Sequence, residues 1–199
     1  MHNAEWFKVY NFLEFILTAI QDQQDFYCEV RRFEDYLNSM MIRNSTVYRL
    51  VDKLFVPVTN EIELQEIQVL KNNASKYELS GVAEHLSASL KLISTKPKPD
   101  LRNSIKESIS MVGAIARLIE PANDLGKSLS KLEQKKAISQ SLASKFKSFY
   151  NYGNDKEGIR HELMDEPNLT LAEARYFLVA CSAFSNYLLG TGGNQRFVC

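Results

Sequence analysis

Apolar residues recur three and four positions apart along most of this 199-residue chain. This spacing predicts amphipathic helices, because strands alternate with a period of two. Glycine and proline are scarce, at 8 and 5 residues, so few long loops are expected. We therefore expect an all-α bundle of about nine helices. The clearest apolar stripe comprises Leu101, Ile105, Ile109, Val112, Ala116 and Ile119.

Short polar residues mark where several helices begin. Thr59 or Asn60 can cap one helix, and Asn60 has a glutamate three residues later, the capping-box spacing. Asn123 or Asp124 can cap another helix, and Thr170 precedes the last one. The predicted helices cover residues 4–21, 23–44, 60–73, 80–94, 100–120, 125–136, 142–152 and 171–189.

The only segment with a strand-like pattern lies at residues 47–58, which are rich in β-branched and aromatic residues. The two halves alternate around Asp52-Lys53, which predicts a two-stranded hairpin. So small a sheet is unstable alone and must pack on helices.

Two further patterns concern organisation. The helix at 4–21 carries an apolar arc wider than one face, so we expect burial on more than one side, either at the centre of this core or against a further domain. Pro97 and Pro99 lie among charged residues and are expected to interrupt the helical pattern. This predicts an N-terminal helical region at 1–95, a helical bundle at 96–190, and a frayed tail at 191–199.

Several chemistries have no support in the sequence. None of His2, His85 and His161 has a cysteine or a second histidine at metal-ligand spacing. The glycine-rich run 190–193 follows a predicted helix, whereas phosphate-binding loops precede one. We therefore expect no metal and no cofactor.

Charge and cysteine usage suggest the compartment. Basic and acidic residues number 24 each, so the chain has no overall positive charge, and any nucleic-acid contact would need a local basic patch. The cysteines Cys28, Cys181 and Cys199 form no CxxC motif and are expected to be free thiols in a reducing compartment. Cys181 occupies an apolar helical position and is expected to fill the core. With no transmembrane run and no signal peptide at residues 1–24, a cytoplasmic location without membrane contact is expected.

One stretch is locally basic. Residues 126–150 contain six lysines against one acid, Glu133. This stretch has two interpretations, a solvated helix face or a surface that contacts RNA phosphates. The candidate RNA contacts are Lys127, Lys131, Lys135 and Lys145.

The dipeptide Arg160-His161 lies between a glycine turn and a proline turn. An imidazole transfers protons near neutral pH, and a guanidinium binds phosphate. This pairing suits cleavage of a phosphodiester. The alternative interpretation is a structural histidine that caps a helix or bonds a carbonyl.

Much of the chain, roughly residues 5–189, resembles AbiJ-type abortive-infection proteins. The most specific segments are Tyr150-Asn151-Tyr152-Gly153 and Gly158-Ile159-Arg160-His161, with the helix that follows them. The segment Asp100–Ile109 is similar to a helix with the pattern RNxxKEAI. Further similar segments are 6–15, 56–61, 125–129, 132–133, 177–179, 181–184 and 186–188.

The C-terminal regions of such proteins are placed with the HEPN helical bundles, many of which are metal-independent ribonucleases acting as dimers. The resemblance implies that His161 transfers a proton and Arg160 binds phosphate. Lys156, at a Lys-x4-His spacing, would be a supporting cation. Asn103 and Glu107 would face the cleft from their helix.

The implied function is anti-phage defence by a homodimeric endoribonuclease acting on cellular or phage RNA. In HEPN ribonucleases several residues separate the arginine from the histidine, whereas Arg160 and His161 are adjacent. The alternative is therefore a degenerate module that binds RNA or a protein, such as a phage component or an antitoxin, without cleavage.

Overall fold

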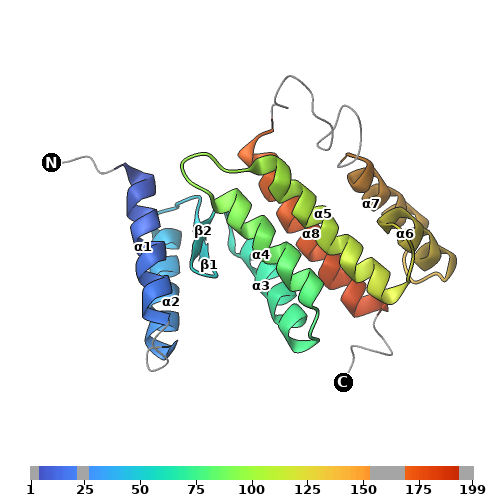
Figure 1. The fold of residues 1–199 in the computed structure, drawn as a ribbon, viewed down its shortest axis with the longest axis horizontal. Helices are drawn as coiled ribbons and strands as arrows, with labels where there is room; N and C mark the ends of the chain where they lie inside the picture. Colours follow the sequence, from blue (N-terminus) through green and yellow to red (C-terminus); the bar gives the residue numbers. More distant parts are fainter. Residues whose placement is uncertain (1–4, 22–26, 153–168, 193–199) are drawn as a thin grey trace.

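The computed structural model describes residues 5–21, 27–152 and 169–192 (Figure 1). These residues form eight helices and one hairpin, which confirms the predicted all-α class with a small hairpin. In chain order the elements are α1 (Trp6–Gln21), α2 (Tyr27–Arg43), β1 (Arg49–Val51), β2 (Leu54–Val56), α3 (Glu61–Lys76), α4 (Ser80–Ser94), α5 (Leu101–Ile119), α6 (Leu125–Gln134), α7 (Gln140–Tyr152) and α8 (Leu171–Gly192).

Polar side chains begin the helices much as the sequence predicts. The Asn60 side chain accepts a hydrogen bond from the backbone N–H of Glu63, and the Glu63 carboxylate accepts one from the N–H of Thr59. The two candidate caps therefore belong to one capping box. Asp100 and Asp124 begin α5 and α6 by accepting from the N–H three residues later. These bonds satisfy donors that a first helical turn leaves without partners.

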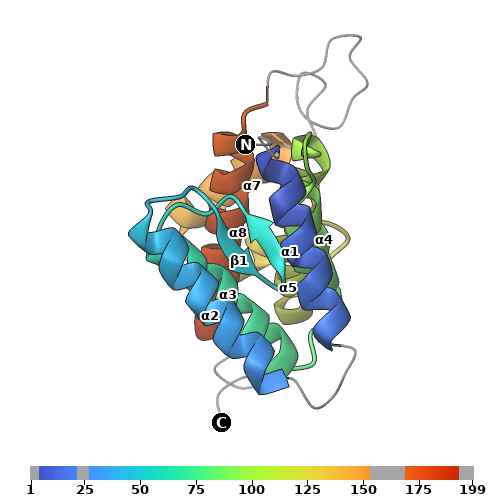
Figure 2. The same cartoon turned by 90° about the vertical axis from the view of Figure 1, so that its left-hand side faces the viewer.

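The hairpin is buried on both faces. Its strands are antiparallel, with Leu50 opposite Phe55 and Val51 opposite Leu54. Since strand side chains alternate, Leu50 and Phe55 pack against α1 and α2, while Val51 and Val56 belong to the core of the other helices. Figure 1 shows α1 and α2 together on the side of the hairpin away from α3 and α4, and Figure 2 views the molecule from that side. The hairpin is thus a wall shared by two cores, which supplies the support so short a sheet needs.

The larger core is built from α3 to α8, with α5 and α8 side by side (Figure 1). The helices α3 and α4 precede the predicted boundary at residue 95, yet they contribute to this same core. Packing therefore joins the two sides of that boundary, and the division into domains stays a prediction. At the other end, α8 runs to Gly192, and residues 193–199 of the predicted tail lie outside the described part of the chain.

The contact between α4 and α5 is lined by small polar side chains. The Ser89 hydroxyl lies 2.8 Å from the hydroxyl of Ser108 and 3.0 Å from the carbonyl oxygen of Ser104. All three serines are buried, and these bonds satisfy their polar groups. Their small size holds the two helices close together, which brings His85 of α4 beside Glu107 of α5.

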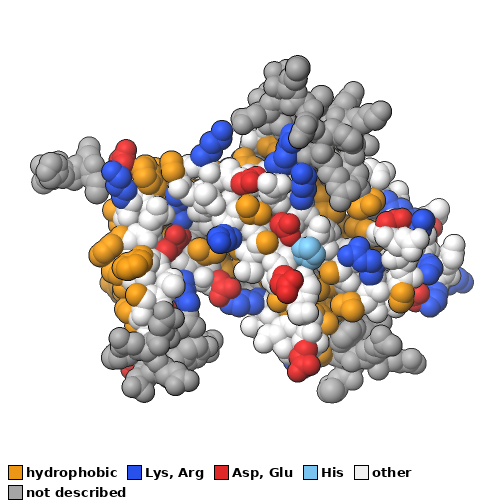
Figure 3. Space-filling view, in the orientation of Figure 1, with side chains coloured by type: hydrophobic (Ala, Val, Ile, Leu, Met, Phe, Trp, Pro, Cys, Tyr) orange, Lys and Arg blue, Asp and Glu red, His pale blue; other side chains and the backbone are white. Residues whose placement is uncertain are grey.

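The helix α1 is covered on one face only. Leu17 is fully buried against α2 and the hairpin. Phe12 and Phe15 are 61% and 68% exposed, and Trp6 and Val9 are also exposed. Hydrophobic side chains accordingly gather at the α1 end of the molecule in Figure 3. The expected burial of α1 on more than one side is therefore wrong for the described structure, because no described element packs against its outer face.

Candidate functional site

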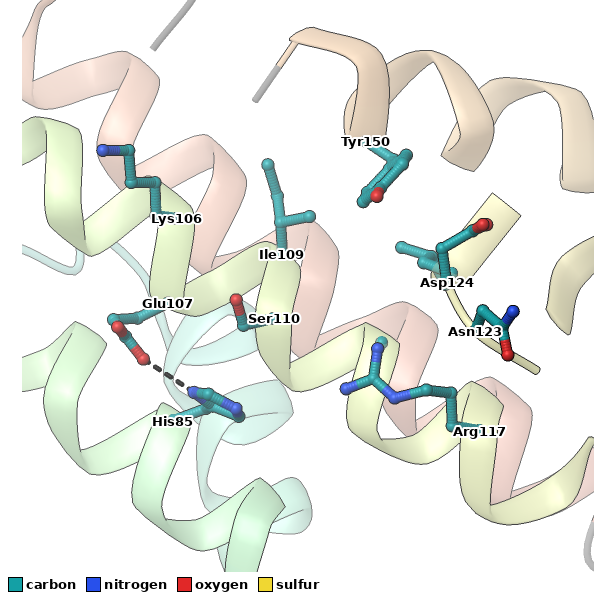
Figure 4. A pocket seen from close by; sticks show the side chains of 11 residues that line it. His85, Lys106, Glu107, Ile109, Ser110, Arg117, Asn123, Asp124 and Tyr150 are labelled. Carbon is teal, nitrogen blue, oxygen red and sulfur yellow. Dashed lines mark hydrogen bonds and ion pairs between the residues drawn. The ribbon is translucent and has the colours of Figure 1, made fainter. Parts of the chain in front are cut away.

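A surface pocket of about 500 Å³ lies between α4, α5, the start of α6 and α7 (Figure 4). We call it the His85 pocket. The apolar stripe of α5 faces the core, so the opposite, polar face of the same helix forms much of the pocket wall. The lining residues are His85, Lys106, Glu107, Ile109, Ser110, Gly113, Arg117, Asn123, Asp124, Leu125 and Tyr150.

His85 and Glu107 form the central pair of the pocket. The Nδ1 atom of His85 lies 2.7 Å from Oε2 of Glu107, and both side chains are about one-third exposed. An ionised carboxylate accepts from Nδ1–H, so it orients the ring and leaves Nε2 for another partner. Nε2 makes no hydrogen bond to any described residue. Figure 4 shows it on the side of the ring away from Glu107.

Two cations of α5 line the pocket without an ion-pair partner among the described residues, Lys106 and Arg117. The guanidinium of Arg117 lies along α5 over Gly113. A Cβ atom at Gly113 would lie 3.1 Å from Nη1 of Arg117. The glycine therefore makes room for the arginine on the pocket wall.

The two acids of the pocket are already engaged. Glu107 binds His85, and Asp124 caps α6 by accepting from the N–H of Lys127. Asp124 also faces the Lys127 ammonium at 3.6 Å and the positive end of the α6 dipole. Among the described residues, the two acids of the pocket have partners and its two cations have none, so the charge left for a ligand is positive.

The candidate residues Asn103 and Glu107 have different positions. Glu107 lines the His85 pocket, where the resemblance had implied a cleft. Asn103 is exposed and donates from Nδ2 to Asp100 at 2.7 Å, so it supports the cap of α5 and does not line the pocket.

The candidate lysines in and just after α6 have local partners. Lys131 donates to the carbonyl oxygen of Pro121 at 2.6 Å, and Lys135 pairs with Glu120. Lys127 lies near Asp124, as described above. These acids precede residue 126, so they fall outside the basic stretch seen in the sequence. Of the four candidate RNA contacts, Lys131 and Lys145 are exposed without an ion pair in the described structure, and only Lys131 of these two makes a hydrogen bond there.

Three candidate catalytic residues, Arg160, His161 and Lys156, lie outside the described residues. The described chain leaves α7 at Tyr152, two residues after Tyr150 of the pocket, and resumes at Leu169.

The comparison that bears on identity concerns the N-terminal part of the chain. Residues 1–73 match AbiJ N-terminal domain 4. This match supports an AbiJ-type family and suggests a role in abortive infection and anti-phage defence. No curated protein and no solved structure is significantly similar to the chain.

The AbiJ domain match and the His85 pocket occupy different parts of the chain. The matched residues include α1, α2, the hairpin and most of α3. Every residue that lines the pocket comes later, from His85 onwards. The pocket is therefore a feature of the helices that follow the AbiJ domain.

The Cys181 thiol lies outside the pocket and is buried. Burial raises the pKa of the Cys181 thiol far above its ordinary value, so this cysteine fills the core as predicted. Among the described residues no group of histidines, cysteines and acids could hold a metal ion. None of the described helices is long and apolar enough to cross a membrane.

His85 and Arg117 are the pocket residues that sequence reasoning missed. His85 is 22 positions from Glu107, so no local spacing joins the two residues. The available signal was weak: both lie on the polar faces of strongly patterned helices, and Arg117 lies next to the apolar stripe of α5.

Proposed function

We propose that this chain is a cytoplasmic anti-phage defence protein of the AbiJ type that acts on RNA as a homodimer. The observation that carries the defence role is the match of residues 1–73 to the AbiJ domain. The RNA role is supported by the His85 pocket, where two unpaired cations and an oriented imidazole suit the phosphates of a nucleic acid.

In this proposal the protein is a metal-independent endoribonuclease. His161 transfers the proton, Arg160 stabilises the charge that develops on the phosphate, and Lys156 supports them. Lys145, together with Lys127, Lys131 and Lys135 once they exchange their local partners, contacts the RNA backbone.

A second candidate function is a non-cleaving module that binds a protein, such as a phage component or an antitoxin. The exposed side chains of Trp6, Phe12 and Phe15 favour it, since a contiguous apolar surface is typical of an interaction site. RNA binding through cations would weaken steeply with added salt, whereas an apolar interface would not.

Cleavage of mixed tRNA and mRNA by the purified full chain in EDTA tests the proposal. The variants are His161→Ala and the matched control His2→Ala. Cleavage by the parent and by His2→Ala that is lost in His161→Ala is the expected result. Cleavage that survives His161→Ala would remove this residue from the mechanism. A parent that binds RNA without cutting it would favour the non-cleaving module, and light scattering would measure the proposed dimer.

A further inference from the structure

The His85 pocket offers polar groups that nothing in the described chain uses. Nε2 of His85 and the guanidinium of Arg117 make no hydrogen bond to described residues. Figure 4 shows that they come from neighbouring helices, α4 and α5, and that the Arg117 side chain lies on the same side of the pocket as Ser110. The guanidinium and the Ser110 hydroxyl can donate to the acceptor oxygens of a phosphate. Because Nδ1–H of His85 already donates to Glu107, Nε2 adds a third donor when the ring carries a second proton.

The side of the pocket near α7 carries Tyr150 together with Asn123 and Asp124 from the start of α6 (Figure 4). The Tyr150 side chain projects from α7 into the pocket (Figure 4), and its ring has no aromatic partner among the described residues. Ile109 and Leu125 also line the pocket and are largely buried. A ring face next to apolar side chains is a typical platform for a nucleobase.

We propose that the His85 pocket binds one nucleoside phosphate, with the phosphate on Arg117 and His85 and the base on Tyr150. The volume of about 500 Å³ is within the range of small-molecule sites. Glu107 acts here as a positioning residue, because it holds Nδ1 and thereby directs Nε2. The ligand is either a free nucleotide or one unit of an RNA strand, and only the second source rests on the proposed function.

Titration of the full chain distinguishes these sources. The probes are the four ribonucleoside 5′-monophosphates, inorganic phosphate, adenosine and a short single-stranded RNA. Calorimetry measures their binding, and the NMR signals of the His85 ring report whether they enter the pocket. We expect a mononucleotide to bind more tightly than either phosphate or adenosine alone. If only the RNA binds and still shifts the His85 ring signals, the ligand is a strand unit. Failure of every probe to bind or to shift these signals would overturn the proposal.

Charge-matched variants separate the pocket from general electrostatics. Arg117→Gln removes an exposed cation from the pocket. Arg102→Gln removes a half-buried cation that lies on the same helix outside the pocket. Arg117→Gln is expected to weaken nucleotide binding by about 10-fold or more, the loss typical of a charge-assisted hydrogen bond, whereas Arg102→Gln leaves it nearly unchanged. Equal losses in the two variants would overturn the site.

Two further variants test the other groups. Tyr150→Leu is expected to weaken nucleotide binding by about 5-fold or more without changing the affinity for inorganic phosphate. Glu107→Gln keeps a hydrogen-bonding group beside Nδ1, and is expected to alter the His85 ring signals as well as the affinity. Circular dichroism of each variant checks that the helices remain. Unchanged nucleotide affinity in a folded Tyr150→Leu variant would contradict the proposed orientation of the base.

The two proposals fail in different ways. Loss of RNA cleavage in His161→Ala with normal nucleotide binding would support both. A parent protein that binds nucleotide but cleaves no RNA would contradict the ribonuclease activity and leave the proposed nucleotide site in place. Cleavage by a parent protein whose His85 ring signals no probe shifts would contradict the pocket alone.

Discussion

Glu14 of α1 and Lys96, just after α4, form an ion pair with 2.6 Å between Oε1 and Nζ, and their side chains are only 17% and 4% exposed. The same carboxylate oxygen accepts from the backbone N–H of Phe55 at 2.7 Å, and Lys96 also donates to the carbonyl of Ser94. The pair therefore connects α1 and the hairpin, both within the region matched to the AbiJ domain, to the end of α4 at one point.

The first prediction concerns this pair. Glu14→Gln leaves the buried Lys96 ammonium without a counter-charge, so we expect the free energy of unfolding to fall by about 2–4 kcal/mol. Urea denaturation measures the change. The matched control is the exposed pair Glu5–Lys8, where Glu5→Gln is expected to cost less than about 1 kcal/mol. Equal effects of the two substitutions would contradict a structural role for the buried pair.

A second prediction concerns Glu34 of α2, whose pKa is raised chiefly by burial. A carboxyl group with a raised pKa in the folded state favours folding when protonated, and this contribution is lost as the pH rises through the folded pKa. Glu34→Gln should therefore raise the Tm at pH 7, and the difference should shrink as the pH falls towards 4. Thermal melts across this range measure it. A difference that grows on acidification would show the opposite sign.

The third prediction concerns Cys181. Because burial raises its pKa, the thiol stays protonated in the folded protein while the unfolded thiol ionises near its ordinary pKa of about 8.5. Stability contributed by this group is present below that pH and declines above it. In a variant with Cys28→Ser and Cys199→Ser, a thiol reagent should modify Cys181 only after denaturant is added. Rapid labelling of the native variant would contradict this burial.

A fourth prediction concerns Gly113 in the middle of α5. Gly113→Ala raises helix propensity by about 1 kcal/mol, while its Cβ displaces the flexible end of Arg117 by a few tenths of an ångström. We expect a higher Tm together with an altered position of the Arg117 guanidinium, visible in its NMR side-chain signals. Gly81, on α4 with open space around it, is the control: Gly81→Ala should raise the Tm and leave Arg117 unchanged.

The sequence by itself determined the local structure. The apolar stripe from Leu101 to Ile119 predicts α5, and Asp100 and Asp124 predict where α5 and α6 begin. Helical periodicity and capping bonds join residues within a few positions, so they can be read from a short window. The hairpin around Asp52-Lys53 is local for the same reason.

Only the tertiary structure decided which side chains meet. It placed His85 against Glu107, joined Glu14 to Lys96 across the fold, and paired Lys135 with Glu120. It also left the outer face of α1 exposed, which an apolar pattern alone had predicted to be covered. These contacts depend on how far apart helices pack and at what angle, and spacing along one helix carries no information about its neighbour.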